Sequence, residues 1–144
     1  MYYKAMRSTW VSILMALISC PIVASASCID DAATRYAVPA SIIKAISRVE
    51  STNNPLAVNH NPDGTFDIGY MQINSRWMPA LRRYGIDEQR LFDLCTNVYV
   101  GTWIIAQNFR HFGYGWDAIG AYNAHDKRKR IIYAHRVAAA LAFN

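Results

Sequence analysis

Apolar residues recur at helical spacing along most of the chain, while the alternation typical of strands is confined to one short region. The clearest apolar stripe comprises Ile42, Ile43, Ile46 and Val49. These positions fall at i, i+1, i+4 and i+7, so they share one face of a helix that packs on a core. Pro39 suits the start of this helix, because a residue in the first turn needs no N–H donor.

Similar patterns predict five further helices. Their expected ranges are Ile29–Tyr36, Arg76–Tyr84, Asp93–Phe112, Trp116–Tyr122 and Lys129–Phe143. Residues 51–61 are rich in Asn, Pro and Ser and indicate a loop. The turn dipeptide Asp63-Gly64 then predicts a small hairpin within residues 58–73. The pattern therefore predicts a mainly α domain with a small β-hairpin region.

The first 26 residues have the features of a secretory signal peptide. These features are the basic residues Lys4 and Arg7, the apolar run Val11–Val23 and the small-x-small site Ala24-Ser25-Ala26. We expect cleavage after Ala26, which leaves residues 27–144 as one exported domain. A lipoprotein signal at Cys20 and an uncleaved anchor are the alternatives, although the apolar run is shorter than the roughly 20 residues that span a bilayer.

Composition and cysteine content agree with an exported globular domain. The 144 residues are 53% apolar and 17% charged, which suits a single hydrophobic core. Loss of the leader removes Cys20 and leaves Cys28 and Cys95, an even pair for which a disulfide is expected in an oxidising compartment. Such a bond is worth on the order of 4 kcal/mol in the loop-entropy model. Two buried free thiols are the alternative.

The net charge changes this picture little. It is +5 for the whole chain, and removal of Lys4 and Arg7 leaves 13 basic and 10 acidic residues, or +3. This modest excess favours approach to an anionic polymer without identifying one. The basic run 127–130 would suggest nucleic acid in a cytosolic protein. After a leader it indicates a solvated helix start or a contact to wall polymers or a partner, so we expect no nucleic acid.

Two carboxylates are the candidate reactive groups. Acid catalysis near neutral pH needs a carboxyl group whose pKa is raised by an apolar, partly desolvated setting. Glu50 directly follows the apolar stripe, and Met71 and Ile73 could fold back against it. Asp67 lies just beyond the hairpin turn among polar residues, which suits an ionised partner for the acid. The alternatives are a solvated glutamate and an aspartate that stabilises the turn.

Three short motifs occur in order along the chain. They are Glu50-Ser51, Gly69-Tyr70-Met71-Gln72-Ile73-Asn74 and Ala121-Tyr122-Asn123-Ala124. Together they resemble the motifs of the family-1 lytic transglycosylases, which belong to the soluble lytic transglycosylase or lysozyme-like superfamily. The resemblance extends over roughly residues 28–137 and implies a lysozyme-like (α+β) domain. The short length and the leader further resemble the small accessory enzymes of type III secretion, type IV pilus and conjugation machines.

A second resemblance overlaps the first. Residues 61–77 are similar to the corresponding stretch of animal C-type lysozymes, including the carboxylate after the turn, here Asp67. The resemblances imply that Glu50 protonates the oxygen of the β-1,4 bond between N-acetylmuramic acid and N-acetylglucosamine. Glu50 then draws a proton from the muramic acid 6-hydroxyl, which closes a 1,6-anhydro ring, or activates water in a hydrolase. Asp67 would stabilise the oxocarbenium-like charge or act as nucleophile.

The resemblance also implies roles near the acid. Ser51 and Tyr122 would form hydrogen bonds around Glu50, Met71 would line its pocket, and Asn123 would support the structure. His125 stands where the family usually has glycine, so the end of that loop is expected to differ.

Further residues are implied in substrate binding. Gln72 and Asn74 would present amides to sugar hydroxyls and N-acetyl groups, and Gly69 would allow close backbone approach to the glycan. Trp77 would be a stacking platform for a sugar ring or, equally, a core residue. We expect no cofactor and no metal. The four histidines lack the spacing of zinc proteases, and an apparent calcium loop that starts at Asn59 has Tyr70 at its twelfth position instead of glutamate.

These observations predict a periplasmic peptidoglycan lytic transglycosylase. It would act on glycan strands to open the wall for a secretion, pilus or conjugation apparatus. A hydrolytic lysozyme that uses Glu50 and Asp67 is the first alternative. A glycan-binding assembly factor without catalysis is the second, and the intact Glu50, Gln72 and Tyr122 argue against it.

Overall fold

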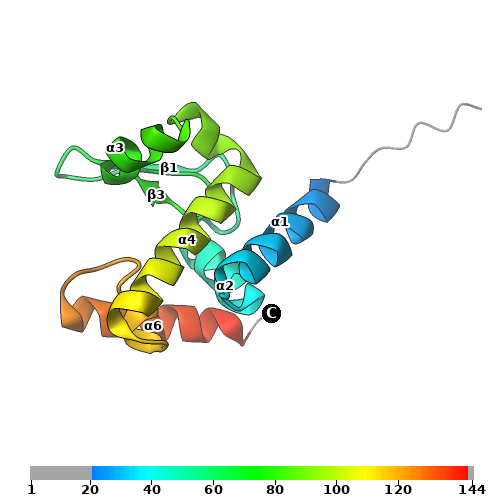
Figure 1. Ribbon diagram of the computed structural model, residues 1–144. Helices are drawn as coiled ribbons and strands as arrows, with labels where there is room; N and C mark the ends of the chain where they lie inside the picture. Colours follow the sequence, from blue (N-terminus) through cyan, green and yellow to red (C-terminus); the bar gives the residue numbers. More distant parts are fainter. Residues whose placement is uncertain (1–20, 143–144) are drawn as a thin grey trace, which may run out of the picture.

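The computed structural model describes residues 21–142, with side chains from residue 28 onward. Its α-helices are α1 (Pro21–Tyr36), α2 (Ala40–Ser51), α3 (Met78–Leu81), α4 (Leu94–Phe112), α5 (Trp116–Gly120) and α6 (Lys127–Leu141). Short 3-10 helices cover Ser75–Trp77, Arg82–Tyr84 and Gln89–Phe92. The long helix α4 crosses the middle of the molecule, with the sheet and α3 towards one end and α6 at the other (Figure 1). The predicted mainly α fold with a small β region is confirmed.

The apolar stripe on α2 packs into the core as its spacing predicts. Ile43 and Ile46 are fully buried, and Ile42 is nearly so. The helix ends because Thr52 adopts a left-handed conformation, with φ of 55°, and its N–H donates to the carbonyl of Arg48. Glu50 therefore lies in the last turn of α2, next to the point where the chain changes direction.

The helix α4 forms the centre of the core. Asp93 caps its first turn by accepting a hydrogen bond from the Thr96 N–H at 2.8 Å, and Gly113 follows its last residue. Val98 and Ile105 are fully buried on its inner face. Its predicted range is confirmed to within one residue at the start.

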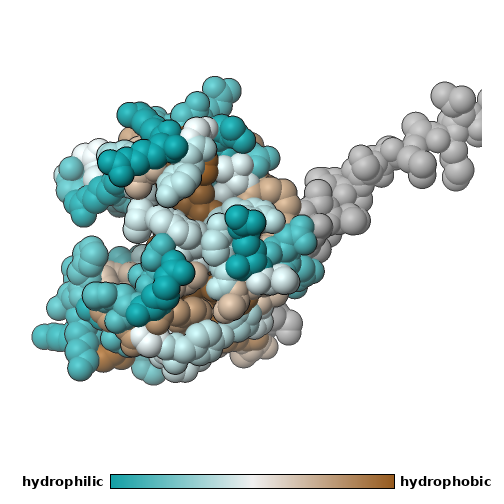
Figure 2. All heavy atoms as spheres, in the orientation of Figure 1, coloured by the Kyte–Doolittle hydropathy of each residue, from teal (hydrophilic) through white to brown (hydrophobic). Residues whose placement is uncertain are grey.

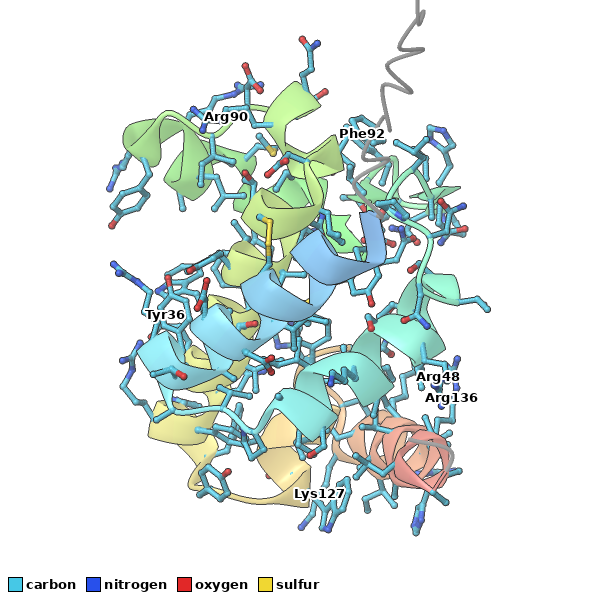
Figure 3. All side chains as sticks on the ribbon, turned by 90° about the vertical axis from the view of Figure 1, so that its right-hand side faces the viewer. Tyr36, Arg48, Arg90, Phe92, Lys127 and Arg136 are labelled. Atoms are coloured by element: carbon cyan, nitrogen blue, oxygen red, sulfur yellow. A yellow bond between two sulfur atoms is a disulfide. The ribbon has the colours of Figure 1, made fainter. Side chains whose placement is uncertain are left out.

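A disulfide joins Cys28 on α1 to Cys95 on α4, with their Cα atoms 5.3 Å apart (Figure 3). It closes a loop with a sequence separation of 67 residues. The expected pairing is thus confirmed, and the bond fastens the first described helix to the central one.

A three-stranded antiparallel sheet follows α2. Its strands are β1 (Val58–His60), β2 (Phe66–Ile68) and β3 (Ile73–Asn74). The predicted hairpin corresponds to β1 and β2, and Gly64 in the turn between them has φ of +82°. The short strand β3 pairs Asn74 with Asp67, so it places a polar side chain beside the second carboxylate.

Several details differ from the sequence prediction. The helix α5 ends at Gly120 instead of Tyr122, and α6 begins at Lys127 instead of Lys129. The helix expected over Arg76–Tyr84 is broken into two 3-10 turns around the short α3, and the 3-10 helix Gln89–Phe92 was not predicted. The helix expected from Ile29 begins earlier, at Pro21. Most of the expected leader, residues 1–20, lies outside the described residues, and so does Cys20. No helix within residues 21–142 has the length and apolar character that membrane crossing requires.

Candidate active site

A cleft of about 780 Å³ separates the sheet from the loop between α5 and α6. Figure 2 shows the molecule hollowed at this place, between its two ends. Residues from four regions line it: Glu50, Asn61, Asp67, Gln72, Ile73, Asn74, Arg76, Trp77, Ile104, Gln107, Asn108, His111, Phe112, Ala121, Tyr122, Asn123, Ala124 and His125. The two predicted carboxylates therefore meet in the same cleft.

Glu50 has the environment of a protonated acid. Burial raises its pKa from 4.5 to about 7, and the negative charge of Asp67 adds a smaller increase. A hydrogen bond from Tyr133 and the positive charge of Arg136 act in the opposite direction. The balance leaves a large share of Glu50 protonated at neutral pH, which is the property that a general acid requires.

Tyr133 is the side chain that holds Glu50. Its hydroxyl donates a hydrogen bond to Glu50 Oε1, and the residue is almost fully buried on α6. Burial and the nearby Glu50 charge both raise the pKa of Tyr133, so the phenol stays protonated and remains a donor. Sequence reasoning missed this residue, because 83 positions separate it from Glu50 and it was expected only as part of a C-terminal helix.

Asp67 is held by two side-chain amides on the edge of the cleft. Asn61 Nδ2 donates to Asp67 Oδ2 at 2.9 Å, and Asn74 Nδ2 donates to Asp67 Oδ1 at 2.7 Å. Amide nitrogens only donate, so both oxygens of the carboxylate accept. This arrangement fixes the orientation of Asp67 and suits an anion that faces the cleft.

Asn74 was expected to present its amide to the sugar, but this amide forms hydrogen bonds with neighbouring groups of the protein. The nitrogen of its amide is used by Asp67 and Thr65, and its oxygen accepts a hydrogen bond from the Arg76 N–H. The pairing of β3 with β2 brings Asn74 directly opposite Asp67. Asn74 lines the cleft, but its amide orients the carboxylate.

Ser51 and Tyr122, expected to form hydrogen bonds around Glu50, both donate to backbone carbonyls of the neighbouring loop. Ser51 Oγ donates to the Tyr70 carbonyl at 2.7 Å, and the Tyr122 hydroxyl donates to the Met71 carbonyl at 2.8 Å. Both side chains therefore fasten the loop that begins at Gly69. Tyr122 still lines the cleft, and its ring lies parallel to that of Tyr133 with centroids 6.5 Å apart.

Gly69 and Met71 lie beneath the cleft instead of on its surface. Gly69 has φ of +80°, and an added Cβ would lie 2.3 Å from Asn97 Nδ2, so the glycine allows a close approach to Asn97. Met71 is fully buried and packs on Gly101 of α4. Neither residue lines the cleft. The loop that they form supports the site from below.

Asn97 organises this loop, and sequence reasoning missed it. Its side chain is fully buried, accepts a hydrogen bond from the Met71 N–H at 2.7 Å and donates to the carbonyls of Ile68 and Leu91. The available sequence feature was an asparagine on the apolar face of the central helix, where a polar side chain needs partners.

The remaining predicted binding residues line the cleft. Gln72 has φ of 51°, and its Nε2 donates to the carbonyls of Ala57 and Gly69. Trp77 is half-buried and packs edge-to-face on Trp103, with ring centroids 5.4 Å apart, so it combines core packing with a surface on the cleft. Asn123 is exposed at the opposite wall.

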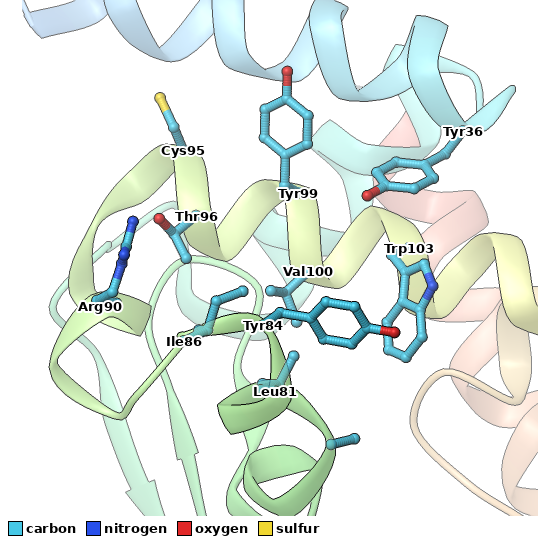
Figure 4. A pocket seen from close by; sticks show the side chains of 11 residues that line it. Tyr36, Leu81, Tyr84, Ile86, Arg90, Cys95, Thr96, Tyr99, Val100 and Trp103 are labelled. Carbon is cyan, nitrogen blue, oxygen red and sulfur yellow. The ribbon is translucent and has the colours of Figure 1, made fainter.

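A second pocket of about 510 Å³ lies between α3, α4 and the end of α1. Arg90 and Thr96 lie at one end, and Tyr36 and Trp103 lie at the other (Figure 4). No carboxylate lines this pocket, so acid catalysis is assigned to the first cleft. Within the described residues, no group of three or more His, Cys, Asp or Glu side chains is placed to hold a metal ion.

Comparison with known proteins agrees with this geometry. The model of the transglycosylase SLT domain matches residues 27–138. The chain belongs to this family. The matched residues contain the three motifs noted in the sequence, together with Asp67 and Tyr133. The lysozyme-like fold class expected from the motifs is confirmed.

Several curated relatives of this SLT domain are bacterial proteins. Invasion protein IagB of Salmonella typhimurium is 41% identical over 106 residues, which cover 73% of this chain and 66% of IagB. Protein IpgF of Shigella sonnei is 38% identical over 135 residues, covering 90% of this chain and 88% of IpgF. A peptidoglycan-binding-like protein of Escherichia coli O157:H7 is 36% identical over 126 residues, covering 79% and 75%.

Proposed function

We propose that the protein is a peptidoglycan lytic transglycosylase that cleaves the β-1,4 bond between N-acetylmuramic acid and N-acetylglucosamine. The observation that carries the proposal is Glu50, a partly buried carboxyl with a pKa of about 7 that lines a cleft beside Asp67. Membership of the SLT domain family and the likeness to a peptidoglycan-binding-like protein support the choice of polymer.

In the proposed reaction, protonated Glu50 gives its proton to the glycosidic oxygen as the bond breaks. The positive charge that develops on the muramic acid ring is stabilised by the carboxylate of Asp67, which Asn61 and Asn74 hold in place. Glu50, now ionised, takes the proton of the ring's own 6-hydroxyl, and this oxygen closes the 1,6-anhydro ring. Tyr133 donates to Glu50 and stabilises the anion in the interval.

The decisive test compares the parent chain with Glu50→Gln on purified peptidoglycan. The amide keeps the shape of the side chain but has no proton to give, so clearing of the wall should fall by orders of magnitude. Glu88, the other glutamate of the chain, is partly exposed beside Arg82, and Glu88→Gln is the matched control. Equal clearing by the parent and Glu50→Gln would refute the proposal.

A hydrolytic lysozyme is the second candidate, and the well-held Asp67 is the observation that favours it. Mass spectrometry of the released muropeptides separates the two reactions, because an anhydro end is one water lighter than a reducing end. Tight glycan binding without any cleavage would instead support the non-catalytic assembly factor.

We further propose that the protein works in the periplasm after cleavage behind Ala26. The Cys28–Cys95 disulfide supports an oxidising compartment. The likeness to a protein named for invasion supports a role beside a secretion apparatus that must pass the wall. Sequencing the N-terminus of the protein recovered from periplasmic extract tests the cleavage site.

A further inference from the structure

One face of α4 borders the cleft over its C-terminal half. The cleft-lining residues on this helix are Ile104, Gln107, Asn108, His111 and Phe112. Their spacing of i, i+3, i+4, i+7 and i+8 is that of a single helix face. Asn108 follows Gly101, the contact of Met71, by seven residues, which is about 10 Å along the helix axis. This stretch therefore lies about two helical turns beyond the level of Met71 and borders the same cleft as the two carboxylates.

Asn108 carries an unpaired donor at this place. Among the described residues, Asn108 Nδ2 is the buried side-chain nitrogen or oxygen that lacks a hydrogen-bond partner. Native proteins rarely leave such a group unpaired, because the lost contact with water is not replaced. Asn108 also lines the cleft, and the terminal torsion of asparagine is soft, so rotation of the amide is the movement that would bring this N–H to the cleft. A ligand that brings an acceptor would satisfy it.

The surroundings of Asn108 match an acetamido group. The side chain of Asn108 offers a neutral donor and, at its oxygen, an acceptor, while Ile104 and Trp77 offer apolar surface in the same cleft. An acetamido group carries a carbonyl oxygen, an N–H and a methyl group. A sugar hydroxyl lacks the methyl group, and a carboxylate lacks the donor.

We propose that Asn108 is a specificity-determining residue that donates to the acetamido carbonyl of an amino sugar bound away from the scissile bond. The proposal rests on the proposed glycan-cleaving function and adds a recognition site on α4 to it. It predicts that the protein discriminates N-acetylated from N-deacetylated glycans through this one side chain.

The test measures binding by calorimetry in the Glu50→Gln chain, where cleavage does not interfere. Asn108→Leu should weaken binding of the N-acetylglucosamine tetramer by about 3- to 10-fold, the size of one neutral hydrogen bond. Binding of the N-deacetylated tetramer should change by less than about twofold, because its amino groups offer no carbonyl. Asn108→Asp keeps the shape but replaces the donor with acceptors, so it should reproduce the loss. Arg110→Leu, exposed on the same helix and outside the cleft, is the control.

A second ligand identifies the sugar. If the loss occurs with the N-acetylglucosamine tetramer, the acetamido group of N-acetylglucosamine suffices. If it occurs only with an alternating tetrasaccharide of N-acetylglucosamine and N-acetylmuramic acid, the muramic acid supplies the group. Unchanged binding of both ligands to Asn108→Leu and Asn108→Asp, or an equal loss for acetylated and deacetylated tetramers, overturns the proposal.

The outcome is separable from that of the proposed function. Wall cleavage by the parent chain, together with glycan binding that substitution of Asn108 leaves unchanged, would reject the acetamido site alone. Binding that depends on Asn108 without any cleavage by the parent chain would keep this site and reject the transglycosylase.

Discussion

Replacement of Glu50 by Gln should make the folded protein more stable at high pH while it abolishes activity. Burial raises the pKa of Glu50 from 4.5 to about 7, so between these values the folded chain holds a proton that the unfolded chain releases. Glu50 therefore makes its full contribution to the free energy of unfolding below about pH 4.5, and this contribution is lost as the pH rises through about 7. The shift of about 2.5 units corresponds to about 3 kcal/mol at 1.36 kcal/mol per unit.

Glutamine stays neutral throughout this range, so the free energy of unfolding of Glu50→Gln does not fall with the titration of this side chain. Urea denaturation should therefore give equal free energies of unfolding for the parent and Glu50→Gln near pH 4.5. At pH 8 the variant should exceed the parent by about 3 kcal/mol. Glu88→Gln, at a partly exposed glutamate, should show no such divergence. A difference between the parent and Glu50→Gln that does not change with pH would refute the reasoning, since it would mean that Glu50 titrates alike in both states.

Two further substitutions test the support of the site. Tyr133→Phe removes a hydrogen-bond donor that lowers the pKa of Glu50. The alkaline limb of the pH profile of wall clearing should therefore move up by about 1 to 2 pH units. The control Tyr84→Phe, at an exposed tyrosine, should leave this limb in place. Gly69→Ala should lower the free energy of unfolding by about 3 kcal/mol or more, because the new Cβ meets Asn97 at a positive φ; Gly64→Ala, at a similar φ in open space, should cost about 1 kcal/mol. Equal denaturation midpoints for the two glycine variants would contradict this explanation.

The local features of the site follow directly from sequence. The apolar spacing that ends at Val49 places Glu50 at the edge of the core, and the Asp63-Gly64 turn returns Asp67 to the same cleft. Each depends on neighbours within about 20 positions, where periodicity and turn chemistry are informative. The disulfide followed from a simple count of cysteines once the leader was set aside.

The long-range features could not be predicted in the same way. Tyr133 reaches Glu50 only because α6 packs beside α2, and the spacing within either helix carries no information about this contact. Ser51 and Tyr122 were expected to form hydrogen bonds around Glu50, and each donates to a backbone carbonyl of the loop below. The same motif residues therefore support the site indirectly, and the direct contact comes from outside the three motifs.

The position of Glu50 in the last turn of α2 has a consequence for its proton. The peptide dipoles of a helix add up to a partial negative charge at its C-terminal end, and this charge disfavours a neighbouring anion by about 0.3 to 1 kcal/mol. The direction in which α2 runs therefore acts together with burial to keep Glu50 protonated. The same glutamate placed in the first turn of a helix would experience the opposite field and release its proton more readily.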